Sequence, residues 1–145
     1  MAFKNLAKLR AAGTARFTFD TLDLGAGHPV LEVRYGGKGT PGFRSDEVRL
    51  ANQQRQRGDK LTERGLEESF ADDAKLIAKH CVVAWSNVVE DDGAAAPCTP
   101  AKVEEFLLAL IESREDLFLG FRRFVRDAEN FVDAPASSGV ELGKS

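Results

Sequence analysis

The sequence predicts a helix-dominated α+β domain, in which one N-terminal β-hairpin packs on about four helices. Two observations lead to this fold class. Polar and apolar residues alternate only near the N-terminus, over residues 16–20 and 30–35, and alternation is typical of half-buried strands. From about residue 43 onward, apolar residues recur at helical spacing instead. The 145 residues match one ordinary domain, expected over residues 1–133 and followed by a mobile tail over residues 134–145.

The N-terminal part is expected to contain a short helix and the hairpin. Phe3, Leu6 and Ala7 lie at helical spacing before Gly13, which predicts a helix over residues 1–13. The hairpin is expected over residues 15–36, where a turn rich in glycine separates the two alternating segments. A single hairpin is only marginally stable in water, so it must lean on the helices.

The helical part is expected over residues 43–131. A glycine-rich stretch before it, residues 36–42, is interpreted as a flexible connector. Ser45 is expected to cap a first helix that ends near Arg57. The apolar face of this helix is thin, chiefly Val48 and Ala51, so we expect the helix to be solvated or to contact a partner.

The next helix is better defined by its apolar stripe. It is expected to begin near Phe70, to continue through Trp85, and to end near the acidic turn at residues 90–93. Apolar residues recur at offsets of 0, 4, 7, 8, 11 and 15 from its start, as on one face of a helix. The residues concerned are Phe70, Ala74, Ile77, Ala78, Cys81 and Trp85.

The last two helices are expected to form a C-terminal antiparallel helical hairpin. Thr99 is suited to cap the first of them, with Pro100 as its first residue. Ser113 is expected to cap the second, because Asp116 follows three residues later in a pattern close to a capping box. The short link between the two helices implies that they run antiparallel.

Composition excludes several classes of protein. The formal net charge is −3 with 30% charged residues, and a dedicated nucleic-acid binder usually carries a clear basic excess. The apolar runs fall far short of the roughly 20 residues that a membrane helix needs, and the N-terminus lacks the apolar stretch of a signal peptide. Two cysteines do not make a disulfide framework in a chain of this length. We therefore expect a protein of a reducing cytoplasm, without membrane or nucleic-acid partners.

The glycine-rich segment at residues 36–40 partly matches the phosphate-binding loop motif. That motif needs a glycine five residues before its Gly-Lys pair and a hydroxyl residue directly after the lysine. Here Glu32 occupies the first position and Gly39 the second. The hydroxyl of Thr40 comes one place too late, so a plain linker is the better interpretation.

No pattern predicts an enzyme, a cofactor or a metal. His80 and Cys81 are adjacent, and neighbouring residues of a helix point in different directions. His28 and Cys98 lie in turns or loops, without the close spacing of a zinc site. The acidic residues are mostly sequence neighbours, whereas paired catalytic acids must face each other across a cleft. Structural roles are therefore expected for all of these residues.

Two features are compatible with protein partners. The last helix and its end carry four phenylalanines, which either belong to the core or leave an apolar patch for a partner. The segment from Arg44 to Arg64 has a net charge of about +2 with interleaved signs, as in a solvated helix or an electrostatic docking face. The phenylalanines are Phe118, Phe121, Phe124 and Phe131.

The order of motifs along residues 16–132 resembles the tail assembly chaperones of long-tailed bacteriophages. A strand-turn-strand start leads to a glycine-rich connector and an Arg/Gln-rich helix, and several short motifs follow. No single one of them is diagnostic. The quoted segments are Tyr35 to Phe43, Val82 to Val89, Asp91-Asp92-Gly93, Pro97-Cys98-Thr99-Pro100, Leu117-Phe118, Phe124 and Asn130-Phe131. Cys98 departs from the family-like pattern, in which an aromatic residue is more frequent.

The resemblance implies a function without catalysis. Such chaperones bind the helix-rich tape measure protein in the host cytoplasm, and a frameshifted longer form of many of them recruits tail tube subunits. They leave before the virion matures. An amphipathic helix in a groove with apolar anchors and a charged rim would suffice for such contacts. On this sequence the anchors are expected on the helix of Trp85 and the helix of Phe118, Phe121, Phe124 and Phe131, and the rim at Arg49, Arg55 and Arg57.

Two other functions remain open from the sequence. One is a structural virion protein, such as a head–tail connector or a tail completion protein, which would stay in the finished particle. The other is a small DNA-binding regulator encoded by a prophage, whose binding would weaken steeply with salt. The sequence also leaves self-association open.

Overall fold

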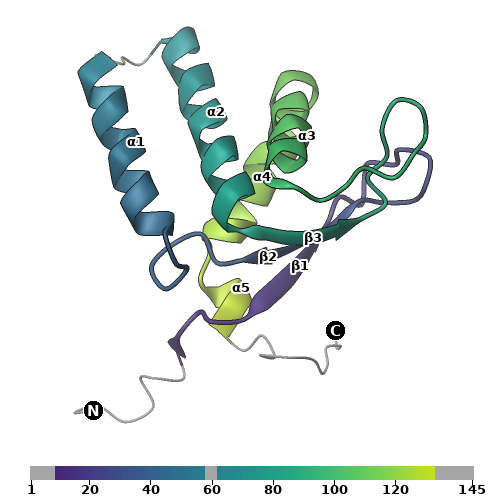
Figure 1. Cartoon of the computed structure of the whole chain (residues 1–145), viewed down its shortest axis with the longest axis horizontal. Coiled ribbons are helices and arrows are strands. Elements are labelled where there is room, and N and C mark those ends of the chain that lie inside the picture. The colour runs from purple at the N-terminus through teal and green to yellow at the C-terminus, as the bar shows by residue number, and fades with distance from the viewer. Residues whose placement is uncertain (1–8, 58–61, 133–145) are drawn as a thin grey trace.

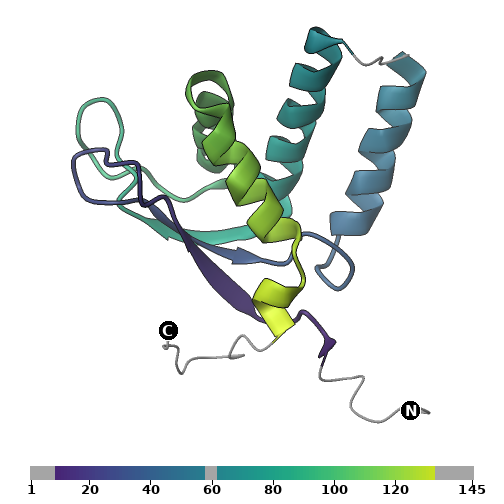
Figure 2. The same ribbon diagram turned by 180° about the vertical axis from the view of Figure 1, so that it is seen from behind.

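The computed structural model describes residues 9–57 and 62–132. Within them, three antiparallel strands form one sheet in the order β1 (Thr14–Thr18), β2 (Val30–Arg34) and β3 (Val82–Ser86). The helices are α1 (Phe43–Arg57), α2 (Glu63–His80), α3 (Pro100–Ser113), α4 (Glu115–Arg126) and α5 (Glu129–Val132). Helices α2, α3 and α4 lie over one face of the sheet, and α1 stands beside α2 (Figures 1 and 2). The predicted class, a helix-dominated α+β fold with an N-terminal hairpin, is confirmed.

The hairpin of β1 and β2 follows the alternation in the sequence. Leu31 and Val33 of β2 are buried, and their partners across the hairpin are Phe17 and Ala15. Glu32 lies between them in β2 and points to the face that the helices leave open, where its carboxylate accepts a hydrogen bond from Thr14 at 3.0 Å. This inward and outward alternation fixes the register, because a slip of one residue would turn the apolar side chains to solvent.

The predicted helix through Trp85 is wrong in its second half. Helix α2 ends at His80, and Val82–Ser86 form strand β3 beside β2, where Trp85 pairs with Leu31. Cys81 makes the junction: its amide donates to Ile77 in α2 at 2.9 Å, and its carbonyl accepts from the Arg34 amide at 2.8 Å. The free edge of β2 needs partners for its backbone groups, and the residues after Cys81 supply them.

The glycine-rich stretch at residues 36–42 forms a packed turn, so its interpretation as a flexible connector is corrected. The Gly36 amide donates to the Val125 carbonyl at 2.8 Å, and the buried Thr40 hydroxyl donates to the Tyr35 carbonyl. Gly42 has a φ of 81°, which favours glycine. A Cβ at Gly42 would also lie 2.9 Å from the His80 ring. This turn fixes where α1 starts.

The helix ends agree with the sequence in one case and differ in two. Thr99 caps α3 as predicted, accepting a hydrogen bond from the Lys102 amide at 3.2 Å, and Pro100 is the first helical residue. Ser45 lies inside the first turn of α1, because the packed turn starts that helix at Phe43. Ser113 is the last residue of α3, so it does not cap α4.

A single residue, Arg114, connects α3 to α4, and the chain reverses direction there (Figure 2). This short connection produces the helical hairpin predicted for the C-terminal part. Residues 1–8 of the predicted N-terminal helix and the predicted mobile tail, residues 134–145, lie outside the described residues.

Phenylalanine rings join the sheet to the helices. The Phe17 ring on β1 lies 5.4 Å from Phe121 and 5.2 Å from Phe124, measured between ring centroids. Phe19 lies 4.9 Å from Phe17 and 5.7 Å from Phe106 of α3. All four pairs are edge-on or tilted, the arrangements that aromatic quadrupoles favour.

We expect Phe121→Ala to lower the free energy of unfolding by about 3–5 kcal/mol, because it removes a fully buried ring from the centre of this cluster. Chemical denaturation of both proteins measures the difference. Leu108→Ala is the control, since Leu108 is 37% exposed and most surface changes stay within about 0.5 kcal/mol. Equal losses at the two positions would contradict the assigned core.

Candidate functional site

Helix α1 is the least embedded of the long helices. Over residues 43–56, only Phe43 and Leu50 are buried, and the Phe43 ring lies 6.2 Å from the His80 ring of α2. The remaining attachments are polar. They involve Asp46, Glu47 and Gln54, and we call this set of contacts the α1 seam. Because apolar burial supplies most of the stability of a docked helix, α1 depends on its polar contacts more than the other helices do.

Asp46 is the centre of the α1 seam. The carboxylate lies 2.7 Å from His80 Nε2, 2.9 Å from Lys79 Nζ and 3.2 Å from Arg49 Nη2. An ionised carboxylate only accepts hydrogen bonds, so His80 Nε2 must donate. These contacts, first that of His80 and then that of Lys79, hold the pKa of Asp46 well below its usual value of 3.8.

No local pattern in the sequence predicts this cluster. The sequence predicts a structural role for His80, whose ring lies 6.2 Å from the Phe43 ring and whose Nε2 bonds Asp46 at 2.7 Å. The two residues are 34 positions apart, and no spacing rule for helices connects positions that distant. Asp46 was expected only to favour the positive N-terminal end of its helix, where it does lie.

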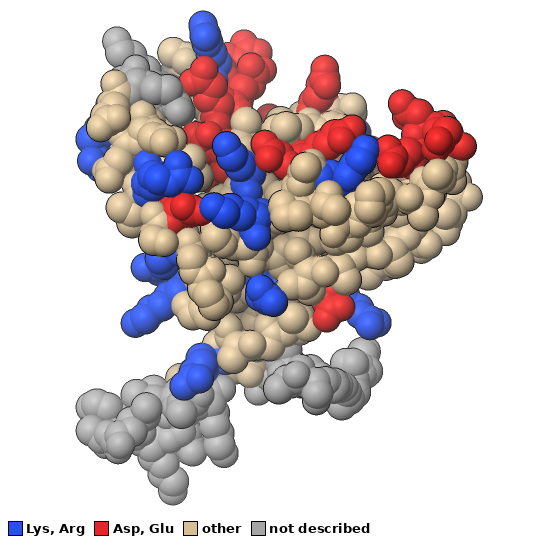
Figure 3. Space-filling view, viewed as in Figure 1, with Lys and Arg blue, Asp and Glu red and all other residues tan. Residues whose placement is uncertain are grey.

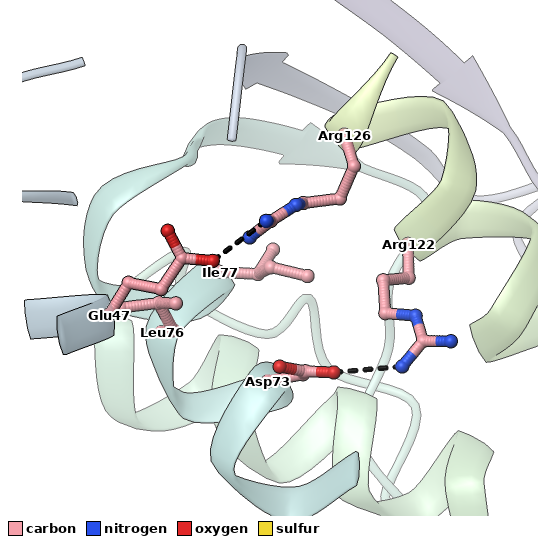
Figure 4. A pocket seen from close by; sticks show the side chains of 6 residues that line it. All are labelled: Glu47, Asp73, Leu76, Ile77, Arg122 and Arg126. Atoms are coloured by element: carbon pink, nitrogen blue, oxygen red, sulfur yellow. Dashed lines mark hydrogen bonds and ion pairs between the residues drawn. The ribbon is translucent and has the colours of Figure 1, made fainter. Parts of the chain in front are cut away.

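A second part of the α1 seam surrounds a pocket of about 220 Å³ (Figure 4). Arg126 of α4 bonds Glu47 of α1 at 2.7 Å, and Arg122 of α4 bonds Asp73 of α2 at 2.8 Å. Leu76 and Ile77 of α2 also line this pocket. Both arginines therefore come from α4, and the carboxylates that they bond come from α1 and α2.

The pocket holds helices together and is poorly suited to a small ligand. Its volume is below the roughly 300 Å³ at which ligand sites begin. The Arg126 guanidinium lies 5.1 Å from the centre of the Phe43 ring, and that of Arg122 lies equally far from the Phe70 ring, so both cations also stack on aromatic rings. Burial raises the pKa of Asp73, partly opposed by Arg122. A ligand would have to break these contacts.

A stripe of α1 beside the seam is open to solvent. We call it the outer face of α1. Along it, apolar and basic residues recur at steps of four, three and four positions, which forms one helical stripe. Val48 is 58% exposed there, and both acidic residues of α1 face the seam. The outer face consists of Arg44, Val48, Ala51 and Arg55, with Arg49 at its flank, and all five are exposed.

Two of the three predicted rim residues lie on this surface. Arg49 bonds Asp46 at one margin of the outer face, and Arg55 bonds Asn52 at 3.0 Å. Arg57 is the last residue of α1, and its side chain is outside the described part. Basic side chains gather over α1 on the left of the molecule (Figure 3).

Most of the predicted apolar anchors are core residues. Phe118, Phe121 and Phe131 are fully buried, so a partner cannot reach them unless the core opens. Their prediction as partner-binding residues is therefore corrected. The sequence leaves both core and patch open for these rings, and the structure assigns them to the core. Phe17 of β1 packs on Phe121, and Phe70 of α2 packs on Phe118. The Phe131 ring packs against Tyr35 and Phe124.

Phe124 and Trp85 are half-buried. The Phe124 ring packs against Phe17 and Phe131. Trp85 lies on β3, contrary to the predicted helix, and its indole nitrogen donates to the Ala96 carbonyl at 2.8 Å. Its ring meets Phe106 edge-on at 5.7 Å. Both rings are occupied by contacts within the chain, so neither is a free anchor.

The remaining candidate groups are the two thiols and the possible metal ligands. Cys81 is buried and Cys98 is exposed. Across residues 9–57 and 62–132, no group of three or more His, Cys, Asp or Glu side chains is placed to hold a metal ion. In the same residues, no helix is both long enough and apolar enough to cross a membrane.

No protein-family model matches this chain, and neither a curated protein nor a solved structure matches it significantly. No residue role is therefore transferred from a relative. The candidate site is the outer face of α1, identified by its exposure and by its charge.

Replacing Asp46 tests the α1 seam. We expect Asp46→Asn to lower the free energy of unfolding at neutral pH, because it removes the carboxylate that His80 and Lys79 hold. A carboxyl group whose pKa is lowered by folding stabilises the fold fully at pH values above its unfolded-state pKa, here 3.8. This stabilisation is lost as the pH falls below that value. The difference between wild type and variant should therefore shrink in acid.

Denaturant unfolding of both proteins along a pH series measures this difference. Asp20→Asn is the matched control, since Asp20 is an exposed loop residue away from the α1 seam. A difference that stays constant from neutral to acidic pH would show that Asp46 acts through packing and that its charge contributes nothing.

Proposed function

We propose that this protein is a tail assembly chaperone of a long-tailed bacteriophage, which binds the tape measure protein and tail tube subunits through reversible contacts and catalyses no reaction. The observation that carries the proposal is the outer face of α1, where Val48 and Ala51 lie among three exposed arginines. An exposed helix with an apolar stripe and a basic rim suits an amphipathic helical partner.

Three further points support it. The order of motifs along residues 16–132 resembles that family. The tape measure protein of such phages is rich in helices, so it offers many segments of the kind that the outer face of α1 would bind. The exposed apolar area is small, which favours weak and releasable binding over a permanent interface. In this proposal the protein acts in the host cytoplasm and is not part of the mature virion.

The binding surface proposed here differs from the one expected from sequence. The charged rim stays at Arg49 and Arg55, while Val48 replaces the buried phenylalanines as the apolar contact. Because Val48 lies between the arginines along the helix, a partner helix would need apolar residues on one stripe and acidic residues beside it.

Co-expression with the tape measure protein from the same genome tests the function. We expect the chaperone to raise the soluble fraction of that protein and to co-purify with it. Val48→Asp should weaken the complex at least about tenfold, or roughly 1.4 kcal/mol, since it removes the apolar contact and places an acid among the arginines. Leu108→Asp is the matched control, because Leu108 is an exposed apolar residue of α3.

Three results would reject the chaperone function. Abundant peptides of this chain in purified virions would favour a structural role, such as a head–tail connector or tail completion protein. Salt-sensitive binding to DNA, abolished by Arg55→Glu, would favour a DNA-binding regulator. A tape measure protein that remains insoluble and does not co-purify would also count against the proposal.

A further inference from the structure

Strand β3 forms a free edge of the sheet. In the order β1-β2-β3 it pairs only with β2. Backbone hydrogen bonds outside the helices and strands involve the residues on either side of β3, Cys81 and Val88, but none of Val82–Ser86. Among the described residues, then, the outer backbone edge of β3 has no partner. Such an edge presents a row of N–H and C=O groups to another strand.

This edge lacks the features by which proteins usually protect one. Charged residues, lysine above all, and prolines normally prevent edge strands from pairing, and the five residues of β3 contain neither. Val83 is 37% exposed, and Ala84 and Ser86 are also exposed. At the height of β3, the face seen in Figure 3 is an uncharged band below the acidic side chains at its top. The one irregularity, a bulge, affects only the first two residues of the strand.

The opposite edge is different. Strand β1 carries the exposed Arg16, and the short helix α5 packs against this strand. A head-to-tail contact of β3 with β1 of another molecule would have to displace α5 and bury that charge. Pairing of β3 with β3 of a second molecule leaves α5 in place and Arg16 exposed. Such a contact is symmetric and gives a closed dimer.

We propose that β3 pairs with β3 of a second copy of this chain, antiparallel about a twofold axis, to give a continuous six-stranded sheet. Full pairing of a five-residue strand with itself must be centred on its middle residue, Ala84. The two Ala84 side chains then face each other at the axis, and Val83 lies opposite the partner's Trp85. When a strand pairs with an identical strand, charged side chains near the axis lie close to the same charges of the second copy and repel them. An uncharged strand such as β3 avoids this repulsion.

The chain already contains the means of a sharp test. Ala84 lies opposite Glu32 across the β2–β3 ladder, so Ala84→Lys adds a favourable cross-strand pair within one molecule. In the dimer, the same change places two ammonium groups against each other at the axis. We therefore expect Ala84→Lys to keep the melting temperature of the fold and to weaken the dimer at least tenfold.

Sedimentation velocity over a dilution series measures the dimer. The wild type should reach twice the 15.8 kDa mass of the chain as concentration rises, and Ala84→Lys should remain at the monomer mass. Thr18→Lys, an equal charge change on the exposed face of β1, should dimerise like the wild type. A wild type that stays monomeric throughout, or an Ala84→Lys dimer as tight as the wild-type dimer, overturns the proposal.

A crosslink tests the register independently. In a Cys98→Ser background, Ala84→Cys should form an intermolecular disulfide under mild oxidation, because directly opposed Cβ atoms lie about 4.5–5.5 Å apart. Thr18→Cys in the same background should stay monomeric on a non-reducing gel. Failure of Ala84→Cys to crosslink at concentrations where the protein is dimeric would reject this register and the proposal with it. The experiment needs no tape measure protein, so its outcome is separate from that of the proposed function.

Discussion

The contact between Phe17 of β1 and the phenylalanines of α4 is the constraint on which the rest of the structure depends. The ring of Phe17 reaches Phe121 and Phe124, and through Phe19 it is joined to α3. A hairpin has little stability of its own, and the two C-terminal helices have an apolar face that needs a cover. Each therefore supplies the surface that the other lacks, although about 100 residues separate Phe17 from Phe121 along the chain.

Helix α1 is attached by a different kind of interaction. Its contacts with α2 and α4 are mostly charged and partly open to water, where ion pairs contribute little individually. The body of the molecule is thus held by burial of apolar area, and α1 is held by a few directional bonds from Asp46 and Glu47. Salt and acid weaken the ion pairs that hold α1 much more than they weaken the apolar core. The helix that carries the candidate site is also the one most easily released.

The sequence predicted the features that depend on local patterns. The hairpin follows from alternation, and the start of α3 follows from Thr99 and Pro100, since cap chemistry acts within a few residues. The continuation of α2 was predicted wrongly because Trp85 extends the helical stripe of Cys81 by chance. Residues 82–86 form a strand because they pair with the free edge of β2, which lies about 50 residues away in the sequence. No local pattern predicts this pairing.

The candidate site was harder to predict than the fold. An apolar stripe on a helix looks the same whether another element or a partner covers it, so the sequence could not decide between core and patch for Phe118, Phe121 and Phe131. Arg49 and Arg55 are exposed, which a thin apolar face predicts because it indicates a solvated helix. The cluster at Asp46 was missed because its members meet only through the packing of α1 on α2.

The two thiols of this chain differ in their access to solvent. Cys81 is fully buried at the junction of α2 and β3, and burial raises the pKa of its thiol to about 12, while Cys98 is exposed. The thiolate is the species that reacts with alkylating reagents, so modification of Cys81 has to wait until the helix and the sheet separate. The rate at which Cys81 is alkylated, compared with the rate at Cys98, therefore reports how often the core opens.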